Sequence, residues 1–371
     1  MSRTNSATET GTRRYQDRIP GLPADHFRRL PEPPGAWVSS IGLGTYLGNH
    51  DDATDELYRE AISRALQVGC NVIDTAINYR CQRSERIIGE VLERSFQAGT
   101  LHRNEVVVST KGGFIPFDSE PPANPAGYFR DTFAHTGVIQ PGEVVAGCHC
   151  LAPQYLSHQL ECSRRNLRLD CIDIYYIHNP ETQLAEIPQS EFHDRMLRAF
   201  ECMEEAVSAG RIRLYGTATW NGYRTPPEGA EHLDLAELLG LARQVAGENH
   251  HFRIIQLPYN LAMTEAFALK TQKLNGKLLS PLEACAELGI YAMASASVFQ
   301  GRATRHLPEF LASAFPGLRT DAQRAIQFVR STPGLGTALV GMKQRAHVED
   351  NLDTARIAPV APAVIEKFFG S

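Results

Sequence analysis

The 371-residue sequence contains no stretch of about 18 consecutive apolar residues, and its first residues lack the apolar core of a signal peptide. It also lacks an excess of basic residues, because 37 Lys and Arg are outnumbered by 42 Asp and Glu and the net charge is -5. No basic segment interleaved with aromatic residues replaces that missing charge. The composition therefore predicts a cytoplasmic globular protein that binds neither membranes nor nucleic acid.

Cysteine is also scarce. Eight cysteines are too few for a disulfide scaffold in a chain of this length, and most fall inside apolar runs. Only Cys148-His149-Cys150 has the residue types of a zinc site, but paired zinc ligands normally have two or more residues between the cysteines, and the sequence contains no CxxC pair. We therefore expect reduced cysteines, no bound metal, and a structural or solvent-loop role for this triplet.

The sequence does have a repeated alternation of strand-like and helix-like segments. The predicted strands are 37–46, 71–75, 105–111, 172–178, 212–219, 253–259, 290–296 and 336–342. The predicted helices are 55–68 with Thr54 as its cap, one opening at Ser84-Glu85, 157–167, 192–209, 233–245, 281–288, 321–330, 348–352 and the tail.

Eight alternating units form either an open doubly wound sheet or a closed barrel. An open sheet would stop near five or six strands and would place a GxGxxG phosphate loop after its first strand. The first predicted strand ends instead in Gly42-Leu43-Gly44-Thr45-Tyr46, which has no third glycine. The pattern therefore predicts an α/β protein with a (β/α)8 TIM-barrel fold.

Two segments interrupt this pattern. Residues 1–26 are polar and show no periodicity, so we expect a flexible or surface-wrapping arm before a single barrel domain over 27–371. Residues 112–153, rich in Pro, Gly and aromatics, form a long insertion after the third strand, at the rim that carries the active site. Tyr128, Phe129 and Phe133 suggest an apolar lining for a substrate mouth, and a surface excursion or subunit contact is the alternative.

Four proton-bearing side chains follow the second, third and fourth predicted strands: Asp74, Tyr79, Lys111 and His178. Each alone has an ordinary structural explanation, such as a helix cap, half-buried packing, a surface charge or a core histidine. In a barrel, however, the C-terminal strand ends meet at one rim, where catalytic groups lie. We therefore predict that these four side chains form a proton-transfer site.

The motifs around these residues resemble those of the aldo-keto reductases. The resemblance runs from about Phe27 to Leu352, through FRRL, GLGTY, DTAxxY followed by SERIIGEVL, VVVSTK, LDCIDIYYIHNP, GRIRLYG, IIQLPYN and VEDNL. It implies an oxidoreductase that takes its hydride from NADPH or NADH without a Rossmann domain. It also implies that Tyr79 is the general acid, that Lys111 paired with Asp74 lowers the pKa of Tyr79, and that His178 orients the carbonyl oxygen.

Elementary electrostatics agrees with these implied roles. A free tyrosine has a pKa near 10, and a cation within about 4 to 6 Å favours the phenolate. A buried ammonium needs a counter-charge, which Asp74 can supply. A hydride must come from a cofactor, because no side chain stores one.

The resemblance implies a cofactor site made of Gly44, Thr45, Tyr46, Asp74, Thr219, Gln256, Gly341, Lys343 and Asn351. It favours NADP(H) and leaves NAD(H) open, because either Lys343 or Arg345 could reach a 2'-phosphate. The chain departs from the family at Ala218-Thr219, where relatives carry Ser-Asn, at Ser295, where many carry an aromatic stacking residue, and at Met342 in the phosphate-binding segment. Each lost polar contact costs about 1–3 kcal/mol.

The function predicted from the sequence is therefore reduction of a small-molecule aldehyde or ketone to an alcohol, or the reverse. The alternative is a barrel of this type with a weakened cofactor site that serves as a lyase, an isomerase or a cofactor-sensing regulator. A binding protein with a vestigial site is disfavoured, because degeneration should not spare all four polar residues.

Overall fold

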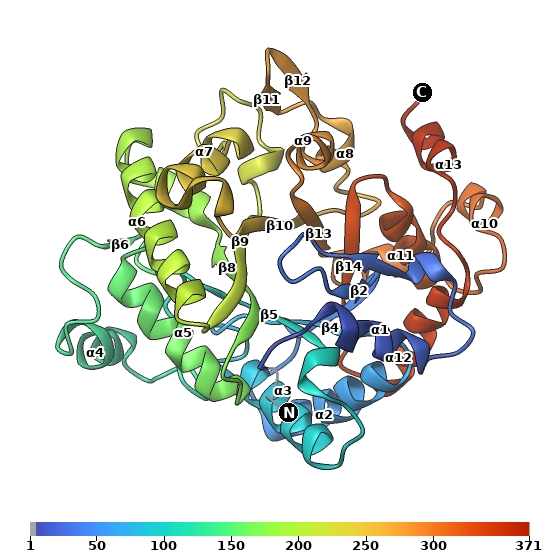
Figure 1. Cartoon of the computed structure of the whole chain (residues 1–371), viewed down its shortest axis with the longest axis horizontal. Helices are drawn as coiled ribbons and strands as arrows, with labels where there is room; N and C mark the ends of the chain where they lie inside the picture. The colour runs from blue at the N-terminus through green and yellow to red at the C-terminus, as the bar shows by residue number, and fades with distance from the viewer. Residues whose placement is uncertain (1–4, 371) are drawn as a thin grey trace.

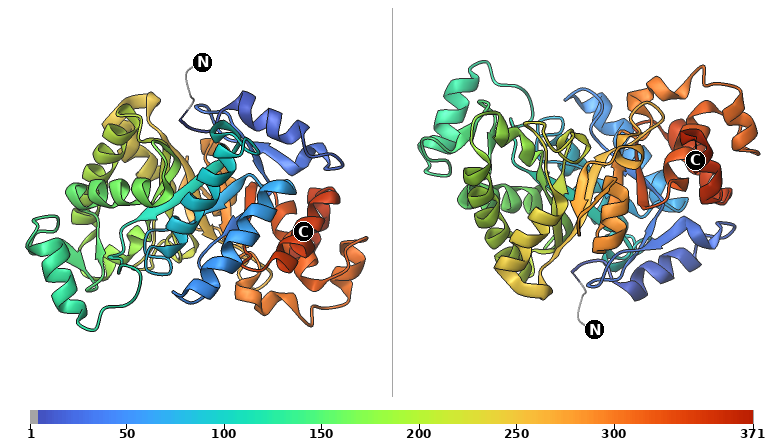
Figure 2. Two further views of the ribbon diagram at one scale, coloured as in Figure 1. Left: turned by 90° about the horizontal axis from the view of Figure 1, so that it is seen from below. Right: turned by 90° about the horizontal axis from the view of Figure 1, so that it is seen from above.

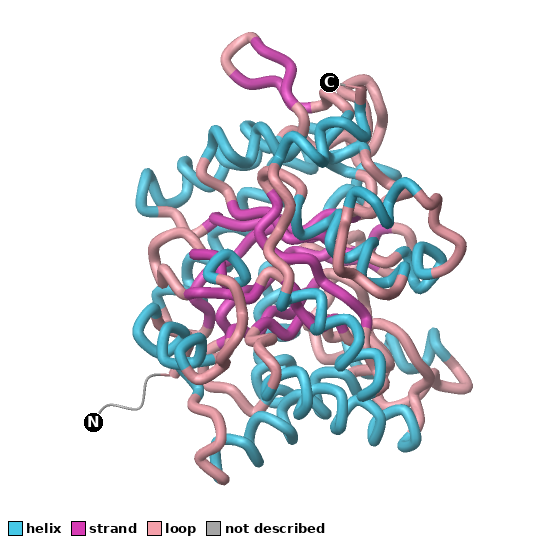
Figure 3. Tube along the Cα trace, turned by 90° about the vertical axis from the view of Figure 1, so that its right-hand side faces the viewer, coloured by secondary structure: helices cyan, strands magenta, loops and turns pink. Residues whose placement is uncertain are grey.

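The computed structural model describes residues 5–370 and contains a closed barrel of eight parallel strands (Figures 1 and 3). In barrel order the strands are β3 (Ile41–Gly44), β4 (Val72–Asp74), β5 (Val107–Gly112), β8 (Ile172–His178), β9 (Ile212–Ala218), β10 (Phe252–Pro258), β13 (Tyr291–Ser295) and β14 (Leu335–Gly341), which pairs with β3. The predicted (β/α)8 fold is confirmed.

Helices surround this barrel and cover its outer face (Figure 2). The helices between and after the barrel strands are α2 (Asp52–Gln67), α3 (Arg83–Gln97), α5 (Pro153–Leu167), α6 (Gln189–Ser208), α7 (Leu235–Ala246), α9 (Pro281–Leu288), α11 (Asp321–Ser331) and α12 (Arg345–Asp353). The outward-facing strand residues and the inner faces of these helices form the larger hydrophobic core. Helix α2 starts earlier than predicted, because Asp51 rather than Thr54 is its cap and accepts a hydrogen bond from Thr54 N at 2.8 Å.

Shorter elements decorate the barrel. The short helices are α8 (Glu265–Ala268), α10 (Phe310–Ala314) and α13 (Pro362–Glu366), and a hairpin of β11 (Gln272–Leu274) and β12 (Lys277–Leu279) projects from the surface (Figure 3). Short 3-10 helices are η1 (Ala24–His26), η2 (Arg103–Glu105), η4 (Pro180–Ala185), η5 (Gly222–Arg224), η6 (Gly247–Asn249), η7 (Phe299–Thr304), η8 (Thr354–Arg356) and η9 (Lys367–Phe369). Within residues 5–370, no helix has the length and apolar character needed to cross a bilayer.

The first predicted strand, 37–46, is two strands. Residues Trp37–Ser39 form β2, which pairs with β1 (Phe27–Arg29) in an antiparallel hairpin, and β3 begins after Ser40. The chain turns there because Ser40 N donates to His26 O at 2.7 Å and Ser39 N donates to Asn71 Oδ1 at 2.8 Å. The hairpin lies across one end of the barrel (Figure 1).

A second apolar cluster, the interior cluster, fills the inside of the barrel. Its members are Ala7, Leu30, Ala36, Val38, Val72, Val107, Ile174, Tyr176, Leu214, Ala218, Ile254, Met293 and Leu339. Residues of the hairpin and of the preceding segment thus pack against the N-terminal halves of β4 and β5. This end of the barrel is closed, and the opposite end carries the C-termini of the strands.

The segment predicted as an arm contains helix α1 (Glu9–Asp17), which the sequence analysis did not predict. Thr8 caps it, and its buried Tyr15 donates a hydrogen bond to Leu66 O at 2.8 Å. Just before the helix, Ala7 N donates to Asp173 Oδ1 at 2.7 Å. The described part of this segment is therefore packed on the barrel, and residues 1–4 lie outside the described residues.

The insertion at 112–153 has its own small core. It contains α4 (Pro125–Phe129), a π-helical turn η3 (Arg130–Ala134) and a hairpin of β6 (Val144–Val145) and β7 (His149–Cys150). Phe133 and Ile139 pack with Cys150 and with Tyr155 of α5. The α4 segment consequently lies at the periphery of the molecule, outside α5 (Figure 1).

Candidate active site

Strand alternation directs three of the predicted catalytic side chains into the barrel. Successive side chains of a strand point to opposite faces, so residues two or four apart share one face. Asp74, Lys111 and His178 stand two or four positions after members of the interior cluster on β4, β5 and β8. Those members are Val72, Val107 and Tyr176. The polar residues therefore form the next layer toward the C-terminal mouth.

A cavity of about 460 Å³ opens at this mouth. Its walls include three of the four predicted catalytic residues, Asp74, Tyr79 and His178. They also include most of the predicted cofactor residues, which are Gly44, Thr45, Tyr46, Thr219, Gln256 and Gly341. Lys111 lies behind the wall, and Lys343 and Asn351 do not line this cavity.

Lys111 and Asp74 form a buried ion pair. Lys111 Nζ lies 2.6 Å from Asp74 Oδ2 and also donates to Thr75 O at 2.7 Å. The other carboxylate oxygen, Oδ1, accepts from Ser109 Oγ at 2.7 Å and from Gln256 Nε2 at 2.9 Å. Burial lowers the pKa of Lys111, and the charge of Asp74 opposes that effect. The carboxylate is thus the centre of a network contributed by three strands.

Tyr79 lies next to this pair and is partly accessible from the cavity. Its ring centroid is 5.0 Å from Lys111 Nζ, 5.0 Å from the ring of Tyr46 and 6.0 Å from the ring of His178. Burial raises the pKa of Tyr79 well above its usual value, and the negative charge of Asp74 adds to the rise. The net pKa of Tyr79 is therefore raised rather than lowered as expected, and the phenol is protonated at neutral pH.

His178 is neutral for a related reason. Burial lowers its pKa well below the usual value, and the charge of Lys111 lowers it further. Its Nδ1 atom is buried and has no hydrogen-bond partner among the described residues. A neutral imidazole carries one N–H donor and one acceptor, so His178 can orient an uncharged polar ligand.

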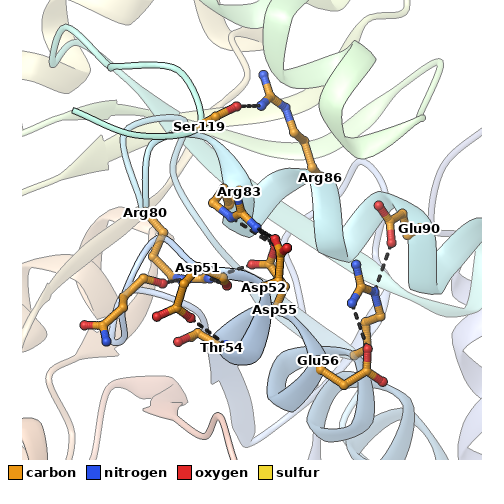
Figure 4. A network of polar contacts seen from close by, with 12 residues as sticks. Asp51, Asp52, Thr54, Asp55, Glu56, Arg80, Arg83, Arg86, Glu90 and Ser119 are labelled. Atoms are coloured by element: carbon orange, nitrogen blue, oxygen red, sulfur yellow. Dashed lines mark hydrogen bonds and ion pairs between the residues drawn. The ribbon is translucent and has the colours of Figure 1, made fainter. Parts of the chain in front are cut away.

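The chain immediately after Tyr79 adopts a strained turn. Arg80, Cys81 and Gln82 have φ values of 50°, 54° and 69°, a left-handed conformation that costs residues other than glycine about 1–3 kcal/mol each. Arg80, whose side chain is 1% exposed, pairs with Asp55 of α2 at 2.5 Å and donates to Asn49 O at 2.7 Å (Figure 4). This ion pair anchors the strained turn to α2 and so holds Tyr79 at the mouth.

Arg83 strengthens the same anchor. It contacts Asp55 at 2.5 Å and also pairs with the exposed Asp52 (Figure 4). Asp55 thus bridges Arg80, the first residue of the turn, and Arg83, which follows it, and this carboxylate fixes the start of α3 against the start of α2.

The cavity also contains polar groups suited to a nicotinamide carboxamide. The Thr219 hydroxyl is buried and lacks a hydrogen-bond partner among the described residues, and a hydroxyl can both donate and accept. Gln256 lines the cavity, although its amide nitrogen already donates to Asp74. The substituted positions Ala218 and Ser295 are at the wall as expected, whereas Met342 is fully buried in the core. The residues present therefore fit a nicotinamide group on the β9 and β10 side.

The aromatic lining of the cavity differs from the prediction. Tyr128, Phe129 and Phe133 do not line it, because they pack on one another and on α5 in the core of the insertion. Phe114, from the start of the insertion, and Trp220, directly after Thr219, line it instead. Proximity in sequence to Lys111 and to Thr219 was the signal that could have identified these two residues.

The Cys148-His149-Cys150 triplet lies in the β6–β7 hairpin region. Cys148 is exposed, whereas His149 and Cys150 are fully buried. Across residues 5–370, no group of three or more His, Cys, Asp or Glu side chains is placed to hold a metal ion.

Comparison with known proteins identifies relatives of this chain. The model of the Aldo/keto reductase family matches residues 40–257. Mouse (Mus musculus) aldo-keto reductase family 1 member C13 is 24% identical over 196 residues, which are 50% of this chain and 49% of that protein. The NADH-specific methylglyoxal reductase of Escherichia coli is 27% identical over 186 residues, 49% of this chain and 48% of that protein. The chain spans about half the length of the curated relatives it matches.

Solved structures extend the similarity of the fold over nearly the whole chain. An aldo/keto reductase from Klebsiella pneumoniae, in complex with NADP and acetate, has a TM-score of 0.62 and 21% identity and covers 93% of this chain and 95% of its own. The family model itself covers more than half of the sequence, and the matched region includes all four predicted catalytic residues. The chain therefore belongs to the aldo/keto reductase family.

Proposed function

We propose that this protein is an NAD(P)H-dependent oxidoreductase that reduces an aldehyde or ketone to an alcohol, or catalyses the reverse reaction, with Tyr79 as the general acid/base. The observation that carries this proposal is the convergence of Tyr79, His178 and the buried Lys111–Asp74 pair at one cavity. That cavity is at the C-terminal mouth of the barrel, where the chemistry of this fold lies.

The raised pKa of Tyr79 suits it to donate a proton. Because its phenol stays protonated at neutral pH, it can give a proton to an oxygen on which negative charge develops. The neutral His178 can hydrogen-bond to the same oxygen, and the positive charge of Lys111 favours the negative charge there. A bound nicotinamide would supply the hydride, which no side chain can store.

We propose that the cofactor lies along the cavity wall formed by the ends of β3, β9, β10 and β14. The unpartnered hydroxyl of Thr219 supports this placement, together with Gln256. Lys343 and Asn351 lie beyond the cavity, after β14, and would hold the far end of the cofactor. NADP(H) is favoured over NAD(H), and the relatives include examples of each cofactor, a Klebsiella protein with NADP and an NADH-specific Escherichia coli enzyme.

The substrate is proposed to be a small carbonyl compound or alcohol. The remaining cavity wall is mostly uncharged, with the rings of Tyr46, Phe114 and Trp220 beside amide groups such as that of Asn78. Such a lining favours an uncharged substrate, because the site offers no exposed counter-ion for a charged one.

The test is a fluorescence titration with NADPH and NADH, followed by turnover of a panel of aldehydes. We expect one cofactor to bind and to raise the thermal stability, because a ligand that binds only the native state shifts unfolding by mass action. Tyr79→Phe should lower reduction by about 10²–10⁴-fold, the usual contribution of general acid catalysis.

Tyr128→Phe is the matched control, because it removes a phenol that packs in the insertion and does not line the cavity, so this variant should retain most of the activity. Near-normal turnover of Tyr79→Phe would show that Tyr79 is not the general acid. Binding of cofactor without any turnover would favour the lyase, isomerase or regulatory alternative. Failure of both cofactors to bind at millimolar concentration would refute the oxidoreductase.

A further inference from the structure

His149 contacts the backbone of the catalytic histidine. The ring nitrogen Nε2 of His149 lies 2.7 Å from the carbonyl oxygen of His178, at the end of β8. His149 itself is on β7, in the insertion, and is fully buried. The insertion therefore reaches the mouth of the barrel through this hydrogen bond, even though its α4 segment lies at the periphery (Figure 1).

Three hydrogen bonds fix the direction of this contact. The guanidinium of Arg195 can only donate, and its Nη1 lies 2.6 Å from Gln183 Oε1, so that atom is the acceptor. Gln183 Nε2 must then donate to His149 Nδ1, 2.8 Å away. A neutral imidazole that accepts at Nδ1 carries its proton on Nε2, and this proton points to His178 O. Burial lowers the pKa of His149 to about 4, which keeps the ring neutral.

Packing holds the same geometry from a second side. The ring of Phe114 meets the rings of both His149 and His178 edge to face, with centroid distances of 4.9 and 5.0 Å. Gly113 precedes it with φ +142°, and a Cβ atom there would lie 2.8 Å from His149 Nε2 and 3.0 Å from His178 O. The approach of the two histidines thus requires a glycine at 113.

We propose that His149 is a positioning residue that holds His178 in its working orientation, through a hydrogen bond from Nε2 to the His178 carbonyl. The proposal rests on the proposed function, because the role of His178 does. It assigns the insertion a part in the reaction. The Arg195–Gln183–His149 chain of hydrogen bonds fixes the backbone carbonyl of His178, and the Phe114 ring packs against the His178 imidazole. Without this bond the His178 carbonyl loses its hydrogen bond from the insertion, and the end of β8 relaxes.

The kinetic test compares His149→Ala with His149→Gln, in the aldehyde reduction found for the wild-type protein. We expect His149→Ala to lower kcat roughly tenfold or more, because small misplacements of catalytic groups have effects of this size. The KM for the cofactor should stay unchanged, since His149 does not line the cavity. His149→Gln should recover most of kcat, because its amide nitrogen can donate from nearly the same place as Nε2.

A stability control separates positioning from general loosening of the insertion. Phe133→Leu removes contacts in the core of the insertion but does not touch His178, so it should lower stability without lowering kcat. The proposal is overturned if His149→Ala keeps full kcat, if Phe133→Leu lowers kcat equally, or if folded His149→Gln stays as slow as His149→Ala.

A measurement that needs no turnover distinguishes failure of this inference from failure of the proposed function. In ¹⁵N-histidine-labelled protein, NMR should show His149 as the neutral Nε2–H form, and His149→Ala should shift the ring signals of His178 while Phe133→Leu leaves them in place. A neutral Nδ1–H form, or His178 signals indifferent to His149→Ala, would overturn the positioning role even in a protein with reductase activity. The expected NMR pattern in a protein that reduces no aldehyde would support the contact and refute only the proposed function.

Discussion

Replacing Asp74 by asparagine should destabilise the protein measurably while leaving its shape almost unchanged. The carboxylate presents two acceptor oxygens, of which Oδ2 serves Lys111 and Oδ1 serves Ser109 and Gln256. The asparagine amide presents only one, so one side of the network loses its acceptor, and Lys111 at 1% exposure loses its counter-charge. Removing one partner of a buried ion pair costs about 3–5 kcal/mol.

That cost converts into a melting temperature. Unfolding entropy is about 2.1 cal/mol/K per residue near 60 °C, so 371 residues give about 0.8 kcal/mol/K. Asp74→Asn should therefore lower Tm by about 4–6 °C, which calorimetry can measure, and should strongly lower reduction of aldehydes.

The double variant Asp74→Leu/Lys111→Met provides the decisive comparison. Replacing a buried pair by apolar residues of similar size is often neutral or stabilising. We therefore expect its Tm to return to within about 2 °C of the wild-type value while its activity stays lost. A wild-type Tm for Asp74→Asn, or a double variant less stable than Asp74→Asn, would refute the reasoning that the uncompensated ammonium is the source of the cost.

Two further predictions concern Tyr79 and its anchor. Because the pKa of Tyr79 is raised above 10, the phenol is protonated from pH 6 to 9, and the rate of reduction should not fall across this range. Alcohol oxidation needs the phenolate, so its rate should rise with pH. A reduction rate that falls with a midpoint below pH 8 would contradict this assignment. Asp55→Asn should lower Tm by about 4–6 °C and lower kcat, because the buried Arg80 loses its counter-charge. Asp52→Asn, at a side chain with 98% exposure, should change neither quantity. Equal effects of the two variants would show that Asp55 does not anchor the turn after Tyr79.

The barrel could be predicted because its strands are buried on both faces. Parallel strands between a filled interior and a layer of helices read as short continuous apolar runs, and all eight runs gave barrel strands. The error at 37–46 has the same origin. Both halves of that run are buried, so the sequence shows no break at Ser40, where side-chain and backbone hydrogen bonds turn the chain.

Elements with little buried surface were not predictable in this way. Helix α1 buries mainly Tyr15 together with Gly11 and Thr12, so its sequence shows no apolar periodicity. The insertion was recognised as a departure from the repeat, but composition alone could not say which surface its aromatic residues would contact. Phe133 packs inside the insertion and on α5, whereas Phe114 contacts the ring of His178 at the candidate active site.

The proximity of the four candidate side chains was predictable, whereas their electrostatics were less so. The order of Asp74, Tyr79, Lys111 and His178 along the chain identified the set, because strand ends converge in a barrel. The direction of the Tyr79 pKa could not be obtained from that order, since it depends on how far burial outweighs a nearby cation.

The same packing explains why the charges of the site are so closely tied together. Below Lys111 the interior cluster and the N-terminal hairpin exclude water, so no solvent reaches the ammonium from that end of the barrel. Its charge must then be balanced inside the protein, and the only acidic side chain bonded to it is that of Asp74 among the described residues. Ser109, on the same strand as Lys111, and Gln256, on β10, donate the remaining hydrogen bonds to this carboxylate. Stability and the proposed proton transfer thus both involve one buried carboxylate, which is why a change there should alter both.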